Sequence, residues 1–259
     1  MNVLEKFKLN NLVAVVTGAG KGIGRGIAIS LAEAGADIVV ASRNKKDLEE
    51  TSIAISSVGK KCLVVPTDVT KKGELENLAL KTKNEFGKID IWVNNAGGLP
   101  DATPRYMSKT SEDEFDAQIN LNLKAVWSGC VIASNYMQET GGSIINISSA
   151  TSKNMKPNIK NGPYGAAKSA VNSLTASFSL ELAPNIRVNA IAPGPIPTEN
   201  FKDSLNLSNQ QEVDSLTKVL NIPLQRLGEV EDIGSAVVFM ASPASSWITG
   251  QCLFVDGGS

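Results

Sequence analysis

The stretch that decides the fold is LVAVVTGAGKGIGRGIAISLAEAGADIVVAS, residues 12–42. An apolar run at 12–17 leads into a glycine-rich turn, a segment of helical period follows at 22–35, and a second apolar run occupies 37–42. Short apolar runs without polar alternation are typical of strands buried on both faces of a parallel sheet. Strand, helix and strand in this order predict a βαβ unit.

The same alternation continues to the end of the chain. Further strands are expected at 62–67, 89–94, 143–148, 186–192 and 252–256, and further helices at 44–58, 71–86, 111–139, 163–183 and 229–241. This rhythm predicts an α/β fold with a doubly wound parallel sheet of about seven strands and helices on both faces. Because no linker, low-complexity tract or repeat divides the sequence, we expect one domain, residues 1–259.

One segment breaks the rhythm. Residues 193–228 form an unusually long connection after the sixth predicted strand. Long connections in compact domains are usually lids or binding loops. We therefore predict that 193–228 is a substrate-binding loop, that Pro193-Gly194 acts as its hinge, and that 195–224 becomes ordered over bound substrate.

Composition narrows the class of protein and of chemistry. Lys and Arg number 25 against 26 Asp and Glu, so no net charge favours nucleic acid or an anionic membrane. No apolar run is long enough to span a bilayer, and the first ten residues lack a signal peptide's hydrophobic block, which predicts a cytoplasmic protein. Histidine is absent and the 3 cysteines are scattered, which argues against a metal site, a disulfide framework and histidine-based hydrolysis. An acid or base must come from Tyr, Lys, Asp or Glu.

The glycine-rich turn is a candidate nucleotide site. Where a strand turns tightly into a helix, glycine lets the backbone approach a pyrophosphate held at the helix N-terminus. A plain tight turn would also use glycine, but the position between the first strand and a helix favours a nucleotide. The residues concerned are Gly18, Gly20, Lys21, Gly22, Ile23 and Gly24.

The end of the second predicted strand indicates which nucleotide. An NAD site places a carboxylate there for the ribose 2′-hydroxyl, but this strand ends in Ala41-Ser42-Arg43. Arg43 could fork onto a 2′-phosphate, and Lys21 could add a second positive charge. The alternative is two solvated surface cations. Their joint placement favours NADP(H).

Polar and small residues also follow the third and fourth predicted strands. Asp68 and Val69 follow one strand, and Asn95, Ala96 and Gly97 follow the other. Ligands of open parallel sheets bind along this edge. Asp68 is expected to bond the adenine amino group, and Asn95 with its neighbours to line the adenosine or to stabilise the central strand. Turn chemistry alone would explain either group equally well.

Taken together, these motifs resemble the short-chain dehydrogenase/reductase family, in particular its single-domain NADP(H)-type members. The resemblance covers nearly the whole chain and rests on Thr17-Gly18-x-x-x-Gly22-Ile23-Gly24, Asp68, Asn94-Asn95-Ala96-Gly97, Asn122, Ser149, Tyr164-x-x-x-Lys168 and Pro193-Gly194. It implies a Rossmann fold with strand order 3-2-1-4-5-6-7, interconversion of ketones and secondary alcohols, and a homotetramer. The interval from Ser149 to Tyr164 is slightly longer than the family's usual one, which puts the intervening loop in doubt, not the catalytic residues.

The family pattern implies a catalytic tetrad of Asn122, Ser149, Tyr164 and Lys168. Tyr164 and Lys168 lie one helical turn apart, so their side chains point the same way. A phenol's pKa of about 10 is too high for a general base at neutral pH, but the charges of Lys168 and of an oxidised nicotinamide would favour the ionised form. Tyr164 would exchange the proton with the substrate oxygen and Ser149 would bond that oxygen. Asn122 would hold a water that links Lys168 to solvent, and Ser148 is the less favoured catalytic serine.

The same pattern assigns residues to the nicotinamide end of the cofactor. Tyr164 and Lys168 would contact the ribose, and Pro193, Gly194, Ile196 and Thr198 would frame the ring.

The substrate is predicted from three segments that should form its pocket, 98–109, 150–163 and 195–224. Their apolar residues are Leu99, Met155, Ile159, Ile196, Phe201, Leu205 and Leu207. This set predicts a fairly apolar, steroid-like or bulky cyclic ketone, although packing on the sheet edge explains each residue alone. A 3-ketoacyl-carrier-protein reductase is the alternative, but the cations near the pocket mouth are nearly balanced by acids, which does not favour an acidic carrier. A non-catalytic NADP-binding sensor is less favoured, because no member of the tetrad is missing.

Overall fold

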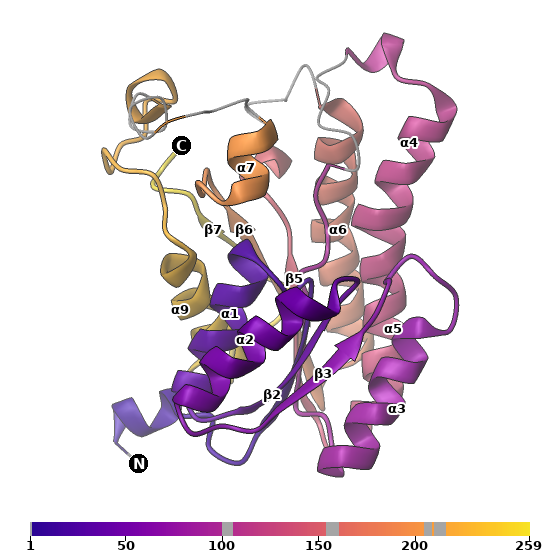
Figure 1. Cartoon of the computed structure of the whole chain (residues 1–259), viewed down its shortest axis with the longest axis vertical. Helices are drawn as coiled ribbons and strands as arrows, with labels where there is room; N and C mark the ends of the chain where they lie inside the picture. Colours follow the sequence, from indigo (N-terminus) through magenta and orange to yellow (C-terminus); the bar gives the residue numbers. More distant parts are fainter. Residues whose placement is uncertain (1, 100–105, 154–160, 205–208, 210–215) are drawn as a thin grey trace.

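A single parallel sheet organises the molecule (Figure 1). The structure is a computed structural model that describes residues 2–99, 106–153, 161–204, 209 and 216–259. The strands are β1 (Val13–Thr17), β2 (Asp37–Ser42), β3 (Cys62–Pro66), β4 (Ile91–Asn94), β5 (Gly142–Ile147), β6 (Ile186–Pro193) and β7 (Cys252–Val255). All neighbours pair in parallel, in the order β3-β2-β1-β4-β5-β6-β7. The doubly wound seven-stranded prediction is confirmed.

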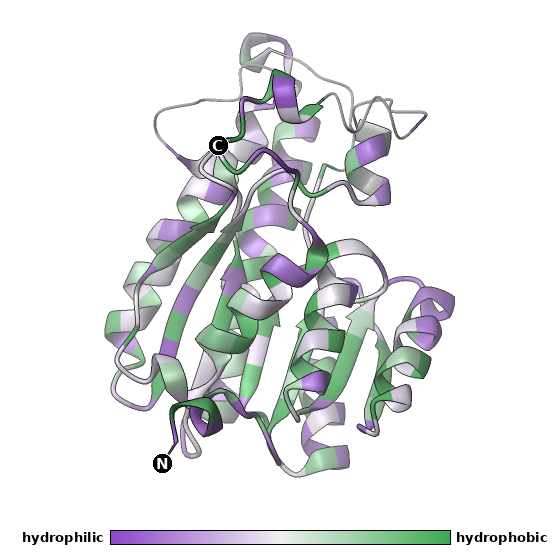
Figure 2. Cartoon of the chain, turned by 90° about the vertical axis from the view of Figure 1, so that its left-hand side faces the viewer, coloured by the Kyte–Doolittle hydropathy of each residue, from purple (hydrophilic) through white to green (hydrophobic). Residues whose placement is uncertain are grey.

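Helices cover both faces of this sheet. One face carries α1 (Gly22–Glu33), α2 (Lys45–Ser57) and α9 (Val230–Ala241), and the other carries α3 (Glu74–Phe86), α5 (Ala125–Met137) and α6 (Gly162–Glu181). Successive β1 side chains alternate between the two cores: Ala14 and Val16 pack on the first face, Val13 and Val15 on the second. Apolar residues on both sides of the strands explain why the runs show no polar alternation. Figure 2 shows the strands as mainly hydrophobic, with hydrophilic residues gathered on the helices.

The helix predicted at 111–139 is interrupted. It consists of α4 (Glu112–Ile119), a π-helical turn at Asn120–Lys124, and α5. The turn contains Asn122, whose side chain bonds within the protein instead of pointing to solvent. Single π-turns inside helices frequently mark functional sites. Short helices that the periodicity did not predict are η1 (Val3–Phe7), η2 (Met107–Lys109), η4 (Ala150–Ser152), α7 (Glu199–Ser204) and η5 (Pro243–Ser245).

Both ends of the long segment 193–228 are fixed to the rest of the domain. Pro193 is the last residue of β6, and the Gly194 N–H donates to the Val255 carbonyl at 2.9 Å. The Gly228 N–H donates to the Pro195 carbonyl at 3.1 Å, which joins the two ends to each other. Pro193 and Gly194 are therefore bonded to the sheet, and their role as a hinge stays a prediction. Among the described residues, no helix is long and apolar enough to cross a membrane.

Candidate active site

The predicted catalytic residues meet at the carboxyl ends of the strands. Ser149 follows β5, Lys168 and Tyr164 lie in the first half of α6, and Asn122 lies in the π-turn before α5. The Lys168 ammonium lies 5.7 Å from the centre of the Tyr164 ring. A hydrogen bond links the side chains of Tyr164 and Ser149. Helix α6 thus supplies a phenol and an ammonium, and the turn after β5 supplies a hydroxyl beside them.

Lys168 is buried and charged in a dry environment. Its Nζ donates to the Ile147 carbonyl at 2.8 Å, and its side chain is almost fully covered. Burial lowers the pKa of the Lys168 ammonium to about 8, because desolvation disfavours the charged form. The ammonium is therefore easier to deprotonate than an exposed lysine.

Burial raises the pKa of the Tyr164 phenol, and the hydrogen bond from Ser149 lowers it in part. The predicted preference for the ionised phenol depends on the positive charges of Lys168 and of an oxidised cofactor. In the chain alone, desolvation is the larger effect.

The two candidate serines have different roles. Ser148 is buried, and its hydroxyl donates to the Lys168 carbonyl at 3.0 Å. Ser149 is half-buried, caps η4, and accepts hydrogen bonds from the N–H and hydroxyl of Thr151 at 3.2 and 2.9 Å. Ser148 thus braces the helix that carries Lys168, while Ser149 is hydrogen-bonded to Tyr164. The catalytic role of Ser149 stays a prediction.

Asn122 is fully buried and held on both sides. Its Nδ2 donates to the Gly98 carbonyl at 2.8 Å and to Gln118 Oε1 at 2.9 Å, and its Oδ1 accepts from the Gly98 N–H at 2.8 Å. A Cβ built on Gly97 would lie 2.9 Å from Asn122 Oδ1 and 3.2 Å from Lys168 Nζ. Asn122 and Lys168 therefore converge beside Gly97, which must remain glycine for them to do so. The water that Asn122 is predicted to hold stays a prediction.

The glycine-rich turn fits the pyrophosphate of a dinucleotide. Gly18 has a φ of +67°, and a Cβ on Gly24 would lie 2.2 Å from the Gly18 carbonyl, so the turn can close only without side chains. Lys21 begins α1 but makes no side-chain cap, and the first turn carries no acidic residue. The first N–H groups of α1, next to Ile23, are thus left for an anion at the positive end of the helix.

The predicted 2′-phosphate ligands are Lys21, within this turn, and Arg43, after β2. Arg43 is exposed after β2 and lies close enough to Asp68 to lower the pKa of that carboxyl, although the hydroxyl of Thr70 is the larger cause. Lys21 forms exposed ion pairs with Glu199 at 3.3 Å and Asp47 at 4.0 Å.

The residues after β3 and β4 have structural contacts of their own. Asp68 Oδ1 accepts from the Thr70 N–H at 3.0 Å, and half-buried Val69 packs on the core under α3. Asn95 Nδ2 donates to the Thr17 carbonyl at 2.8 Å, and the Ala96 N–H donates to Thr17 Oγ1 at 3.1 Å. Of the two roles left open for Asn95, the structure supplies the bracing of β4 against β1.

The residues predicted at the nicotinamide end follow β6. Thr198 lies against the glycine-rich turn, since a Cβ on Gly22 would be 3.1 Å from its methyl group. Ile196 is buried between Gly228 and the core. Of the apolar pocket residues, Leu99, Ile196 and Phe201 are described as half-buried or buried, whereas Met155, Ile159, Leu205 and Leu207 lie outside the described residues. No cluster of metal-binding side chains occurs in the described part of the chain.

Three contacts around the candidate site are not predicted from the sequence. They are the Ile147 carbonyl under Lys168, the Gln118 amide beside Asn122, and the pairing of Lys153 with Asp256. Gln118 lies one helical turn before Asn122, a spacing visible in the sequence. A main-chain acceptor and a pair of distant loop residues leave no such signal.

Known proteins are similar to this chain over nearly its whole length. Residues 18–259 match the family model described as enoyl-(acyl carrier protein) reductase. The 2-dehydro-3-deoxy-D-gluconate 5-dehydrogenase of Dickeya dadantii is 38% identical, over 99% of this chain and 98% of that protein. The 3-oxoacyl-[acyl-carrier-protein] reductase of Thermotoga maritima is 33% identical, over 97% and 98%. A solved 7α-hydroxysteroid dehydrogenase, complexed with NADH and 7-oxo glycochenodeoxycholic acid, superposes with a TM-score of 0.90 at 33% identity, over 100% of this chain and 98% of that one.

Proposed function

The chain belongs to the short-chain dehydrogenase/reductase family of oxidoreductases, and from this membership we propose that it interconverts a ketone and a secondary alcohol with NADP(H). The observation that carries the proposal is the convergence of Tyr164, Ser149 and Lys168 at the end of the sheet. An intact tetrad also favours an enzyme over a non-catalytic sensor.

The side chains have complementary roles in the reduction. The cofactor supplies the hydride when bound. Ser149 donates a hydrogen bond to the substrate oxygen and Tyr164 gives it the proton, for which the raised pKa keeps the phenol protonated at neutral pH. Lys168, beside the Tyr164 ring, supplies positive charge that stabilises the phenolate left behind. In alcohol oxidation the same groups act in reverse.

The choice of NADP(H) rests on Arg43. No carboxylate ends β2, and an exposed guanidinium stands in its place, where it suits a 2′-phosphate better than a ribose hydroxyl. The Lys21–Glu199 ion pair is exposed on both sides, and the Lys21–Asp47 pair is long at 4.0 Å, so both are weak enough for a phosphate to exchange with them. The solved hydroxysteroid dehydrogenase holds NADH, so relatives at this identity can differ in cofactor.

For the substrate we propose an apolar, steroid-like or bulky cyclic ketone. Leu99, Ile196 and Phe201 are described apolar residues of the three segments predicted to form the pocket, and one relative is a hydroxysteroid dehydrogenase. The alternative is a 3-ketoacyl carrier protein, which gains support from the name of the Thermotoga relative and from the description of the matching family.

We also propose that the chain acts as a cytoplasmic homotetramer. All three cysteines are free, which suits a reducing compartment. Large apolar side chains are exposed at Trp247, before β7, and at Trp127, on α5, and their burial between copies would be favourable.

A cofactor and substrate screen tests the proposal. The wild type, Arg43→Asp and Tyr164→Phe are assayed with NADPH and NADH against a bulky cyclic ketone and a 3-ketoacyl thioester, free and on its carrier. We expect kcat/KM to favour NADPH in the wild type and NADH in Arg43→Asp. Tyr164→Phe should bind NADPH but lose turnover.

Each part of the proposal has its own contrary result. A wild-type preference for NADH would refute the cofactor assignment. Retained turnover in Tyr164→Phe would refute the tetrad. Faster reduction of the thioester, increasing when the carrier is attached, would select the alternative substrate.

A further inference from the structure

The turn that carries Ser149 is tied to the far end of the chain by Lys153. Ser149 caps η4, and Lys153 follows it, with its N–H donating to the Ala150 carbonyl at 3.1 Å. The Lys153 ammonium pairs with the Asp256 carboxylate, donates to the Ser259 carbonyl at 2.8 Å, and lies 5.0 Å from the centre of the Phe254 ring. One side chain thus joins the serine turn to β7 and to residues 256–259, called here the C-terminal tail.

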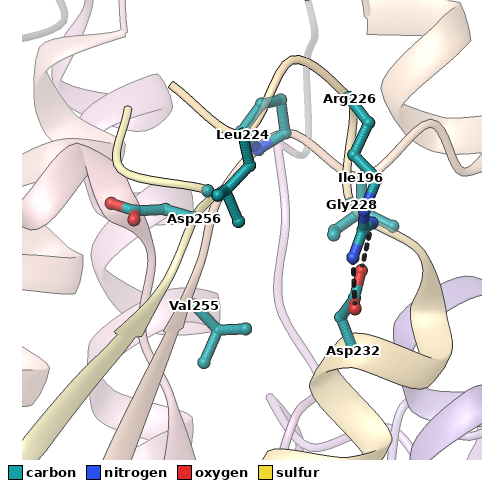
Figure 3. A pocket seen from close by; sticks show the side chains of 10 residues that line it. Ile196, Leu224, Arg226, Gly228, Asp232, Val255 and Asp256 are labelled. Atoms are coloured by element: carbon teal, nitrogen blue, oxygen red, sulfur yellow. Dashed lines mark hydrogen bonds and ion pairs between the residues drawn. The ribbon is translucent and has the colours of Figure 1, made fainter. Parts of the chain in front are cut away.

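The C-terminal tail also contacts both ends of the segment 193–228. A Cβ on Gly194 would lie 2.6 Å from Asp256 Cα, so the two backbones are in close contact. The Leu224 N–H donates to the Gly257 carbonyl at 3.2 Å. Figure 3 shows the pocket between these segments, with Asp256 on one side and the Arg226–Asp232 ion pair on the other. The tail therefore connects the serine turn with the segment expected at the nicotinamide end.

Burial makes the Lys153–Asp256 pair more than a surface contact. The side chain of Asp256 is 6% exposed and that of Lys153 is 30% exposed. A carboxylate this far from water needs a cationic partner, and loss of that partner leaves an uncompensated charge. The Lys88–Asp90 pair, 2.9 Å long and 37% and 16% exposed, lies at the start of β4, away from the catalytic end of the strands. It provides a matched control.

We propose that Lys153 is a positioning residue: through Asp256 it holds the Ser149 turn against the C-terminal tail, so that the Ser149 hydroxyl faces Tyr164 and the substrate oxygen. The inference rests on the proposed ketone reduction. Lys153 itself touches neither Tyr164 nor the reacting atoms. Its effect should therefore appear in the chemical step and in the order of the turn, and not in cofactor binding.

The test compares Lys153→Met, Lys153→Arg and Lys88→Met. Methionine keeps the apolar stem without the charge, and arginine restores the cation. For Lys153→Met we expect kcat for ketone reduction to fall roughly tenfold or more, as small misplacements of catalytic groups do, with the Kd for NADPH within about twofold of wild type. Lys153→Arg should recover most of the kcat, and Lys88→Met should keep it.

A second measurement does not depend on turnover. The amides of Ser152 and Lys153 bond to the Ser149 and Ala150 carbonyls at 3.0 and 3.1 Å, so hydrogen exchange there reports the order of the turn. Lys153→Met should speed exchange at these amides, and Lys88→Met should not. Should Lys153→Met fail to fold, the milder Lys153→Gln and the Arg variant take its place in the comparison, whereas loss of NADPH binding in a folded variant would count against the positioning role.

The outcomes distinguish a failure of the positioning role of Lys153 from a failure of the proposed ketone reduction. Unchanged kcat together with unchanged exchange at Ser152 and Lys153 would overturn the positioning role. Faster exchange in Lys153→Met, in a protein whose wild type reduces no ketone, would support the tie and refute the proposed function instead. A kcat loss that Lys153→Arg does not recover would also count against the ion pair.

Discussion

The buried ammonium of Lys168 lies next to the Tyr164 ring and the Ile147 carbonyl, where desolvation disfavours its charged form. In the unfolded chain its ammonium is solvated and has the ordinary pKa of a lysine, about 10.4. In the fold, burial lowers that pKa to about 8. The native state therefore binds fewer protons than the unfolded state between these two values, and stability rises with pH across that window.

Replacing Lys168 by Met should remove this pH dependence. Relative to Lys168→Met, the wild type should gain up to about 3 kcal/mol in the free energy of unfolding as pH rises from about 8 to about 10.5, and none below pH 8. Lost bonding to Ile147 adds only a pH-independent offset. Chemical denaturation of the cofactor-free protein across this range measures the difference, with Lys81→Met, an exposed lysine on α3, as control. Parallel curves for the wild type and Lys168→Met would contradict the assignment.

The sequence predicted the residues of the site better than their bonding. Tyr164 and Lys168 share a helix, so their spacing alone aligned them. The family resemblance favours Ser149 over Ser148 as the catalytic serine. The structure adds a physical reason, because the Ser148 hydroxyl is already bonded to the Lys168 carbonyl. The Lys153–Asp256 pair joins loop positions more than a hundred residues apart, and no periodicity links such residues.

At the scale of elements, α7 is the part of the segment 193–228 that reaches the glycine-rich turn. Thr198, just before α7, lies against Gly22, and Glu199 pairs with Lys21. The ion pair is exposed and screened by solvent, so it holds α7 only weakly. The ends of the segment, by contrast, are fixed at Gly194 and Gly228.

Cofactor binding should therefore order α7 while leaving the ends of its segment unchanged. The backbone amides of α7 should exchange faster than those of Gly194 and Gly228 in the free protein, and should slow when NADPH is bound. Hydrogen exchange with and without NADPH measures this, and Glu199→Gln separates the ion pair from packing. Equal strong protection of α7 in both states would contradict the expected closure.

Element boundaries were predictable where apolar periodicity set them. Strands β1, β2 and β6 lie within a residue of the expected ranges, because hydrophobic cores on both faces fix them. The π-turn at Asn120–Lys124 was not predicted, since it keeps helical periodicity and differs only in backbone bonding. The sequence signal at Asn122 was its low helix propensity, which indicated a special residue without indicating the geometry.

At the scale of the whole molecule, Trp247 and Trp127 are exposed tryptophans, among the described residues, that a contact between copies would cover. Trp247 is 99% exposed beside β7, which lies at the edge of the sheet, and an edge strand offers unpaired main-chain groups to a neighbour. Trp127, on α5, is 47% exposed. Two separate exposed residues of this kind fit an assembly of four chains with two kinds of contact, as in a dimer of dimers.

Charged substitutions should dissect that assembly. Wild-type protein is expected at the mass of four chains, and Trp247→Glu and Trp127→Glu should each yield smaller species by disrupting one contact. Ile53→Glu replaces an equally apolar, exposed residue on α2 and should leave the mass unchanged. Light scattering after size exclusion measures all four proteins, and a monomeric wild type would refute the tetramer.

The reversal of strand order between β1 and β4 has a consequence for how such a protein can change. The residues proposed to choose the nucleotide follow β1, β2 and β3, whereas those proposed to choose and convert the substrate follow β5 and β6. The exposed Lys21–Glu199 ion pair and the contact of Thr198 with Gly22 join the two groups only weakly. Free-energy effects of substitutions at Arg43, which follows β2, should therefore largely add to those of substitutions after β5. Evolution or protein engineering can therefore change the cofactor preference of this oxidoreductase without changing its substrate specificity. New substrates can then be selected with either cofactor.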